Sequence, residues 1–258
     1  MAPLFGWRVL VPRPEGSADE LAERLRRVGA EPVLAPLIEI RAQSGSSEMR
    51  RAVDELAVGA FDWVAFTSVA AVSATLDAAR RAGLAWPVGG GTRVAAVGRS
   101  TAGALQRAGI AVDLVPDGAG SARSLVAAWP VEAEGRSVLL PRSDRALPEL
   151  PDALRRKGYR IRETVAYRTV TLPVPAAVAR DLVTGRIRAV LLTSPSTAGA
   201  LTDVPIAPDV VLVAIGASTA AAARDAGLVV AVTATQPSAA GLVDALTRVS
   251  VTDTPARP

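Results

Sequence analysis

The sequence predicts an α/β protein made of two similar open parallel-sheet domains, and two observations lead to this prediction. The first is an internal repeat: residues 9–14 (VLVPRP) recur as residues 138–143 (VLLPRS), and the same spacing relates Gly29 to Gly158. The second is the alternation of short apolar runs with helical patterns along the chain. This alternation favours parallel sheets with crossover helices, whose doubly buried strands are unbroken apolar runs.

The first copy of the repeat opens with an apolar strand at 7–12. Ser17 and Glu20 have the spacing of a capping box, and the helix that follows is expected to end at Gly29. An extended run at 32–40 comes next. The elements expected after it are a helix at 47–58, a strand at 62–66, a helix from 69, a glycine loop at 89–91, a strand at 93–97, a helix to 109, a strand at 111–115 and a helix at 121–129.

The second copy is expected to repeat this order. Its predicted elements are a strand at 138–142, a helix ending at 158, an extended run at 160–169, a helix after Pro173 and Pro175, strands at 189–192, 210–215 and 229–233, and a helix at 238–246. Residues after about 249 are expected to form a frayed tail.

The composition excludes several kinds of chemistry. The 258 residues are half apolar, which suits one large or two medium domains, and they include no cysteine and no histidine. Disulfides, thiolates, histidine triads and histidine-ligated metals are therefore absent. The carboxylates lack ligand spacing, and neither a dinucleotide glycine fingerprint nor a Walker lysine motif is present, so we expect no metal and no cofactor. No apolar run is long enough for a membrane span and no signal-peptide pattern opens the chain, so a cytoplasmic location is expected.

The charge balance points towards an anionic small molecule. The net charge is +4, from 29 Lys and Arg against 25 Asp and Glu, and nearly all the cations are Arg. Most of them can be explained as solvated helix faces. Arginine also binds carboxylate and phosphate through a planar fork. Nucleic acid is a less attractive partner, because the basic residues are spread in pairs and aromatic residues make up only 3%.

A candidate anion site follows from the expected strand order. Parallel α/β sheets bind ligands at the carboxyl ends of their strands, where free helix N–H groups attract negative charge. The candidate substrate-binding residues at these ends are Arg13, Thr67, Ser68, Gly98, Thr101, Arg142, Ser143, Thr193, Ser194, Ser196, Gly216, Ser218 and Thr219. Each one alone is as well explained as a helix cap. Their recurrence in both copies favours a ligand with many negative groups, held mainly by backbone amides.

Tyr167 is the candidate catalytic residue. It and Tyr159 are the two tyrosines of the chain, and it lies in the extended run before Pro173 and Pro175. Its ring could simply pack on a sheet. Alternatively, its phenol could hydrogen-bond or donate a proton in a cleft, one of few such options in a chain without histidine.

Six short motifs, in order and at suitable spacing, resemble the uroporphyrinogen-III synthase family. They are VPRP at 11–14, FTS at 66–68, VGRST at 97–101, AYRT at 166–169, TSPS at 193–196 and IGAST at 215–219. The resemblance covers nearly the whole chain. It departs from the family at Pro12, where threonine is more usual.

The resemblance implies a cofactor-free lyase of tetrapyrrole (heme) biosynthesis. The linear substrate hydroxymethylbilane would lose water and close, with inversion of its terminal pyrrole ring, to uroporphyrinogen III in an interdomain cleft. Tyr167 would assist departure of the hydroxyl group. The eight carboxylates of the substrate suit the helix-start sites, and much of the catalysis would lie in positioning. The expected protein is a cytoplasmic monomer that binds neither nucleic acid nor membrane.

The repeat alone allows two consecutive domains divided near Ala133, but the resemblance implies a different organisation. The two flavodoxin-like domains would comprise residues 1–38 with 172–258, and residues 42–166. A two-strand β-ladder at 38–42 and 166–171 would join them as a hinge. Two other functions stay open beside this one. They are a two-lobed non-catalytic binding protein for an anionic small molecule, and a phosphosugar enzyme that also uses Ser and Thr at helix starts.

Overall fold

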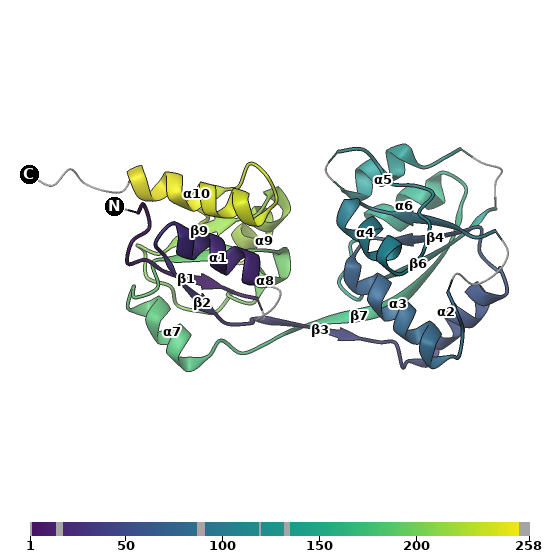
Figure 1. Cartoon of the computed structure of the whole chain (residues 1–258), viewed down its shortest axis with the longest axis horizontal. Helices are drawn as coiled ribbons and strands as arrows, with labels where there is room; N and C mark the ends of the chain where they lie inside the picture. Colours follow the sequence, from purple (N-terminus) through teal and green to yellow (C-terminus); the bar gives the residue numbers. More distant parts are fainter. Residues whose placement is uncertain (1, 14–17, 87–90, 119, 132–134, 253–258) are drawn as a thin grey trace, which may run out of the picture. The chain divides into compact units, whose positions relative to one another are not determined.

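A computed structural model describes residues 2–13, 18–86, 91–118, 120–131 and 135–252 (Figure 1). The chain divides into two compact units, one made of Met1–Glu39 with Val170–Pro258 and the other of Ile40–Thr169. It passes between them inside two strands, β3 (Ile38–Ala42) and β7 (Arg160–Thr171). None of the helices in the described ranges has the length and apolar character needed to cross a membrane.

The first unit has a five-stranded sheet in the order β10-β9-β8-β1-β2, with parallel neighbours. Its strands are β1 (Arg8–Val11), β2 (Glu31–Leu34), β8 (Ala189–Leu192), β9 (Val211–Ala214) and β10 (Val232–Thr233). Its helices are α1 (Asp19–Arg27), α7 (Ala176–Val183), α8 (Pro195–Gly199), α9 (Ala217–Asp225) and α10 (Ala239–Thr252). Helices α1 and α10 lie side by side (Figure 1).

Alternate residues of these strands enter two different cores. Val9 and Leu191 pack with α1 and α10 on one face of the sheet. Leu10 and Val190 pack with α7 and α8 on the other face. All four side chains are fully buried, and each such side chain contributes about 1.5–3 kcal/mol. Burial on both faces explains why these strands are unbroken apolar runs.

The second unit has a five-stranded sheet in the order β3-β7-β6-β4-β5. Its further strands are β4 (Trp63–Phe66), β5 (Arg93–Ala96) and β6 (Ser137–Ser143). Strand β4 is parallel to β5 and β6, and β6 is parallel to β7. The helices are α2 (Ser47–Ala57), α3 (Val69–Arg81), α4 (Arg99–Arg107), α5 (Ala122–Ala128) and α6 (Glu149–Arg156). One core joins the sheet to α2, α3 and α4, and the other joins it to α5 and α6.

Strands β3 and β7 are neighbours and run antiparallel. The backbone N–H of Leu172 donates to the carbonyl of Leu37, and that of Gln43 donates to the carbonyl of Ala166. Partner numbers therefore fall along one strand as they rise along the other, which is the antiparallel pattern. The prediction of an α/β chain with two largely parallel sheets is confirmed.

Several predicted elements differ from the structure. The strand expected at 111–115 is a single bridge between Leu114 and Ala95, because the Asp113 carboxylate accepts the N–H of Val94 at 2.7 Å beside it. The strand expected at 229–233 is only the two residues of β10. The prediction that a frayed tail begins after about residue 249 is wrong, because α10 continues to Thr252 and Ser250 is buried.

Two further predictions fall partly or wholly on residues that are not described. The glycine loop at 89–91 lies outside the described residues except for Gly91. Ser17, the expected cap of the first helix, lies outside them too. Helix α1 begins at Asp19, and Ala18 at its N-cap makes no side-chain cap.

Candidate functional site

Four of the predicted binding residues are the N-caps of helices that follow parallel strands. Ser68 precedes α3 and Gly98 precedes α4 in the second unit, while Ser194 precedes α8 and Gly216 precedes α9 in the first. These helices start at the carboxyl ends of β4, β5, β8 and β9. Each start leaves backbone N–H groups without partners inside its helix. Each sheet therefore carries, at its own carboxyl edge, backbone N–H groups that attract carboxylates.

The two serine caps are built differently from the two glycine caps. Ser68 Oγ accepts the N–H of Ala71 at 3.1 Å, and Ser194 Oγ accepts the N–H of Thr197 at 3.2 Å. Gly98 and Gly216 make no side-chain cap, and both have extended backbone. A Cβ at Gly98 would lie 3.1 Å from the Cα of Gly120, whereas a Cβ at Gly216 would meet nothing within 4 Å. Gly98 thus has little room for a side chain, whereas Gly216 borders open space.

Burial separates the predicted hydroxyl residues into two groups. Thr101 and Thr219 are only 2% and 1% exposed, so their side chains cannot touch a ligand in this structure. These positions can offer a ligand only the N–H groups of the first helical turn, and whether they bind one stays a prediction. Thr67, Thr193 and Ser196 are half-buried, and Ser218 is exposed. These residues keep hydroxyl groups within reach of solvent.

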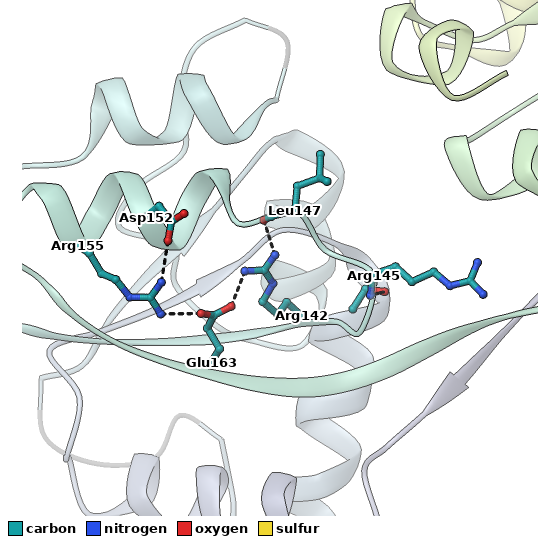
Figure 2. Close-up of polar contacts among 7 residues, drawn as sticks. Arg142, Arg145, Leu147, Asp152, Arg155 and Glu163 are labelled. Atoms are coloured by element: carbon teal, nitrogen blue, oxygen red, sulfur yellow. Dashed lines mark hydrogen bonds and ion pairs between the residues drawn. The ribbon is translucent and has the colours of Figure 1, made fainter. Parts of the chain in front are cut away.

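Arg142 is not the free cation that the sequence suggested. It is 8% exposed, and one end of its guanidinium donates to Glu163 Oε2 at 2.6 Å. The other end donates to the backbone carbonyl of Leu147 (Figure 2). Glu163 also accepts from Arg155 at 2.7 Å, which raises the pKa of that guanidinium, and Arg155 donates to Asp152 at 2.9 Å. Protein groups thus take two of the five N–H donors of Arg142, and whether the others reach a ligand stays a prediction.

The loop after β6 is closely tied to its surroundings. Ser143 Oγ accepts the N–H of Arg145 at 3.2 Å and lies 3.2 Å from Asp144 Oδ1. The N–H of Asp144 donates to the carbonyl of Tyr167 at 3.2 Å, and Asp144 Oδ1 accepts the N–H of Thr169 at 3.3 Å. Ser143 is thus one part of a small network that fixes the loop against β7.

Strand pairing places Tyr167 at an irregularity in the sheet. Arg142 pairs with Val165, but the next residue, Ser143, pairs with Tyr167, so Ala166 is an extra residue in β7. Such a bulge bends a strand and redirects its side chains. Tyr167 is half-buried and packs against the α2–α4 core. Among the residues described, none hydrogen-bonds to its phenol, which leaves the hydroxyl available for a ligand.

Two small cavities flank Arg142 in the second unit. One, of about 200 Å³, lies at the carboxyl ends of β4 and β6 and is mainly apolar, with Thr67 and Leu147 in its wall. The other, of about 190 Å³, is lined by the carboxylates of Glu48, Asp144 and Glu163. An anion is repelled by the second and is better accommodated at the first.

The remaining predicted residue, Arg13, follows β1 in the first unit and is exposed. Its N–H donates to the carbonyl of Val11 at 2.8 Å. The described residues bring no three His, Cys, Asp or Glu side chains into a group that could hold a metal ion.

Comparison with known proteins decides the family. A family model described as "Uroporphyrinogen-III synthase HemD" matches residues 19–244, and so takes in both units. The chain belongs to the uroporphyrinogen-III synthase family. The resemblance predicted from the six motifs is thereby confirmed.

Individual members of the uroporphyrinogen-III synthase family agree with this assignment. The "Porphyrin biosynthesis protein HemD" of Ruminiclostridium josui is 28% identical over 86% of the chain, but the chain spans only 44% of that relative's length. The "Uroporphyrinogen-III synthase" of Chlorobaculum parvum is 28% identical over 85% of the chain and 89% of its own length. A crystal structure of a mutant uroporphyrinogen III synthase from the bacterium Thermus thermophilus matches with a TM-score of 0.69 at 21% identity. That match covers 96% of this chain and all of that one, and it shows the shared fold.

Some features of this family member could not be found from the sequence. The bulge at Ala166 depends on pairing between strands that have no local signature. Glu163 also gave no signal, because its role arises only when β6 and β7 align Leu140 with Glu163. Arg145 lies two residues after the repeated segment 138–143 that the sequence analysis singled out, and nothing in the sequence pointed to it.

Proposed function

We propose that this chain is a uroporphyrinogen-III synthase: it cyclises hydroxymethylbilane to uroporphyrinogen III, with loss of water and inversion of the terminal pyrrole ring. The observation that carries this proposal is the family match, which runs through both units of the chain. The helix starts at the carboxyl edges of both sheets support it, because the substrate carries eight carboxylates.

The proposed binding groups are backbone amides and small hydroxyls. The free N–H groups at the starts of α3, α4, α8 and α9 would each donate to one oxygen of a substrate carboxylate. The Ser194 hydroxyl already donates to Thr197 Oγ1 at 3.4 Å. The Ser68 hydroxyl would add a donor, since its oxygen accepts a backbone N–H and still carries its own hydrogen. Ser218 and Arg13 would do the same from exposed positions. Fixed dipoles of this kind bind the flexible chain in one shape before it closes.

Tyr167 is the proposed catalytic group. Departure of the substrate hydroxyl as water requires a proton, and the phenol O–H can supply a hydrogen bond or a proton to that oxygen. The bulge at Ala166 supports this role, as does the lack of a hydrogen-bond partner for the phenol among the residues that the structure describes. After water has left, the electron-deficient methylene carbon is attacked by the substituted α-carbon of the terminal pyrrole ring, which gives a spiro intermediate. Cleavage of that α-carbon's bond to the older methylene bridge moves the positive charge to the bridge carbon. The bridge carbon then bonds to the unsubstituted α-carbon of the same ring, which loses its proton, and the ring is inverted. In this proposal the enzyme holds that ring in place so that inversion precedes simple closure.

We also propose that the units are the two predicted domains, residues 1–38 with 172–258 and residues 42–166. Residues 38–42 and 166–171 would form the hinge, and the substrate would bind in a cleft to which both carboxyl edges contribute. Helix starts of the same kind lie at the carboxyl edge of each sheet, which supports a site with contributions from both units. The protein would act as a cytoplasmic monomer without a cofactor.

The test is an isomer assay on the purified full chain. Hydroxymethylbilane is incubated with the protein, the product is oxidised to porphyrin, and the type I and type III isomers are separated by chromatography. We expect type III to predominate, whereas a heat-denatured sample should give type I by spontaneous closure. Type I alone with the native protein would contradict the proposal and favour a non-catalytic anion-binding protein.

A further inference from the structure

The loop after β6 contains one arginine that the protein uses internally and one that it leaves free. Arg142 is buried and donates to Glu163 and to the carbonyl of Leu147. Arg145 is exposed, and no described residue pairs with its guanidinium. Figure 2 shows its side chain extending away from the Arg142–Glu163–Arg155 network. The two arginines are therefore suited to different tasks.

The backbone around Arg145 is held on both sides. Before it, Ser143 Oγ accepts the N–H of Arg145 itself at 3.2 Å, and the N–H of Asp144 donates to Tyr167 at 3.2 Å. After it, the N–H of Ala146 donates to the carbonyl of Ser143 at 3.2 Å. An exposed residue on an anchored backbone loses less conformational freedom when it binds than one on a mobile loop.

Arg142 fixes the end of this loop at Leu147. Its hydrogen bond to the carbonyl of Leu147 fixes the segment that also lines the 200 Å³ cavity. Glu163 balances the buried charge, and Arg155 in turn holds Glu163 (Figure 2). The guanidinium fork allows Arg142 to bind Glu163 and Leu147 at the same time. A lysine at this position has a single point charge and cannot reproduce that geometry.

We infer that Arg145 binds a carboxylate of the substrate, and that Arg142 is the positioning residue that holds its loop in place. This inference rests on the proposed function, which supplies the polycarboxylate. An arginine fork is the strongest side-chain partner for a carboxylate. The hydrogen bonds of Asp144 to Tyr167 and Thr169 tie the same loop to the bulged segment of β7. Arg145 thus fixes one substrate carboxylate beside the strand that carries the catalytic phenol.

The test compares Arg145→Gln with Arg107→Gln. Arg107 is the last residue of α4 and lies at the opposite edge of the sheet. Like Arg145, it is exposed and has no partner among the described residues. Its substitution therefore removes the same charge at a place away from the proposed site. We expect Arg145→Gln to raise KM about tenfold and to change kcat by no more than about twofold. The reason is that the variant loses one charge-assisted hydrogen bond that is made equally in the ground state and in the transition state. The rise should shrink at high salt. Arg107→Gln should leave both constants unchanged.

Arg142→Lys tests the positioning role. If Arg142 acts through Arg145, the single change raises KM, and the double variant Arg142→Lys with Arg145→Gln has the KM of Arg145→Gln alone. A purely structural arginine would lower the melting temperature, leave KM unchanged and give additive effects. That result would overturn the positioning role.

A binding measurement separates this inference from the proposed function. Calorimetric titration of the full chain with uroporphyrin, an octacarboxylate, requires no turnover. If the wild type makes no type III isomer but Arg145→Gln still weakens uroporphyrin binding about tenfold, the proposed reaction fails and the carboxylate site stands. If Arg145→Gln matches Arg107→Gln in both KM and uroporphyrin affinity, the inference is overturned.

Discussion

Asp62 joins the start of β4 to the start of β6 in the second unit. Its carboxylate accepts the backbone N–H of Ser137 at 2.7 Å, the Ser137 hydroxyl at 3.0 Å and Arg136 at 2.5 Å. These bonds, with the Ser137 N–H as the largest cause, lower the pKa of Asp62 from 3.8 to about 2. Because the folded pKa is lowered, the stabilisation is complete above the unfolded pKa. It is lost as the pH falls from about 4 towards 2.

The size of this effect follows from the pKa. A change from 3.8 to about 2 corresponds to at most about 2.5 kcal/mol at neutral pH. The Asp62 side chain is 27% exposed, so solvent screening reduces the expected value to about 1–2 kcal/mol. By the same relation, about half of the contribution remains at pH 3.

Asp62→Asn removes the charge and keeps the size of the side chain. We expect the free energy of unfolding to fall by about 1–2 kcal/mol at pH 7, and the difference from wild type to be about halved at pH 3. Urea unfolding followed by tryptophan fluorescence measures this in the relevant unit, because Trp63, Trp86 and Trp129 all belong to it and Trp7 is the only other tryptophan.

Asp54→Asn is the matched control. Asp54 pairs with Arg50 on the exposed face of α2 at 2.9 Å, an arrangement worth at most about 0.5 kcal/mol. If Asp62→Asn were no more destabilising than this control at pH 7, the reasoning would be refuted. A loss that stayed the same at pH 7 and pH 3 would show that charge is not the cause.

Three further predictions concern the phenol of Tyr167, the second unit on its own and the two glycine caps. Tyr167→Phe should lower kcat about ten- to a thousandfold through loss of acid assistance. The control Tyr159→Phe should keep turnover but cost about 1 kcal/mol of stability, because its hydroxyl donates to the Pro130 carbonyl at 2.9 Å. A fragment of residues 40–169 should unfold cooperatively and give a dispersed amide NMR spectrum, since it contains both cores of its sheet. Gly216→Ala should raise KM without loss of stability, whereas Gly98→Ala should lower the melting temperature through its contact with Gly120.

The sequence predicted most strands because burial on both faces leaves an unmistakable apolar run. Residues 189–192 were predicted as a strand, and β8 occupies the same residues. The strand expected at 111–115 failed because its pattern has an acid in the middle. Asp113 uses its carboxylate to accept the N–H of Val94, and a single bridge at Leu114 remains of the pairing. Apolar periodicity does not show when a side chain takes the place of a ladder partner.

The candidate site was less predictable, because its residues depend on contacts that are distant in sequence. Helix starts can be recognised locally, so Ser68 and Ser194 were correctly placed at caps. The burial of Thr101 and Thr219 could not be foreseen, because it depends on which face of each short helix meets the sheet. Whether any of these residues contacts substrate stays a prediction.

Arg13 and Arg142 occupy equivalent positions in the repeat, yet their surroundings differ for a simple reason. Strand β1 aligns Val11 with Leu34, and β6 aligns Leu140 with Glu163, which is the same register in each copy. The position equivalent to Glu163 is therefore Leu34, which has no carboxylate to offer. Arg142 is drawn into the interior by Glu163, whereas Arg13 stays exposed after β1. One substitution between the copies thus gives Arg142 a carboxylate on the neighbouring strand, where the residue equivalent for Arg13 is a leucine.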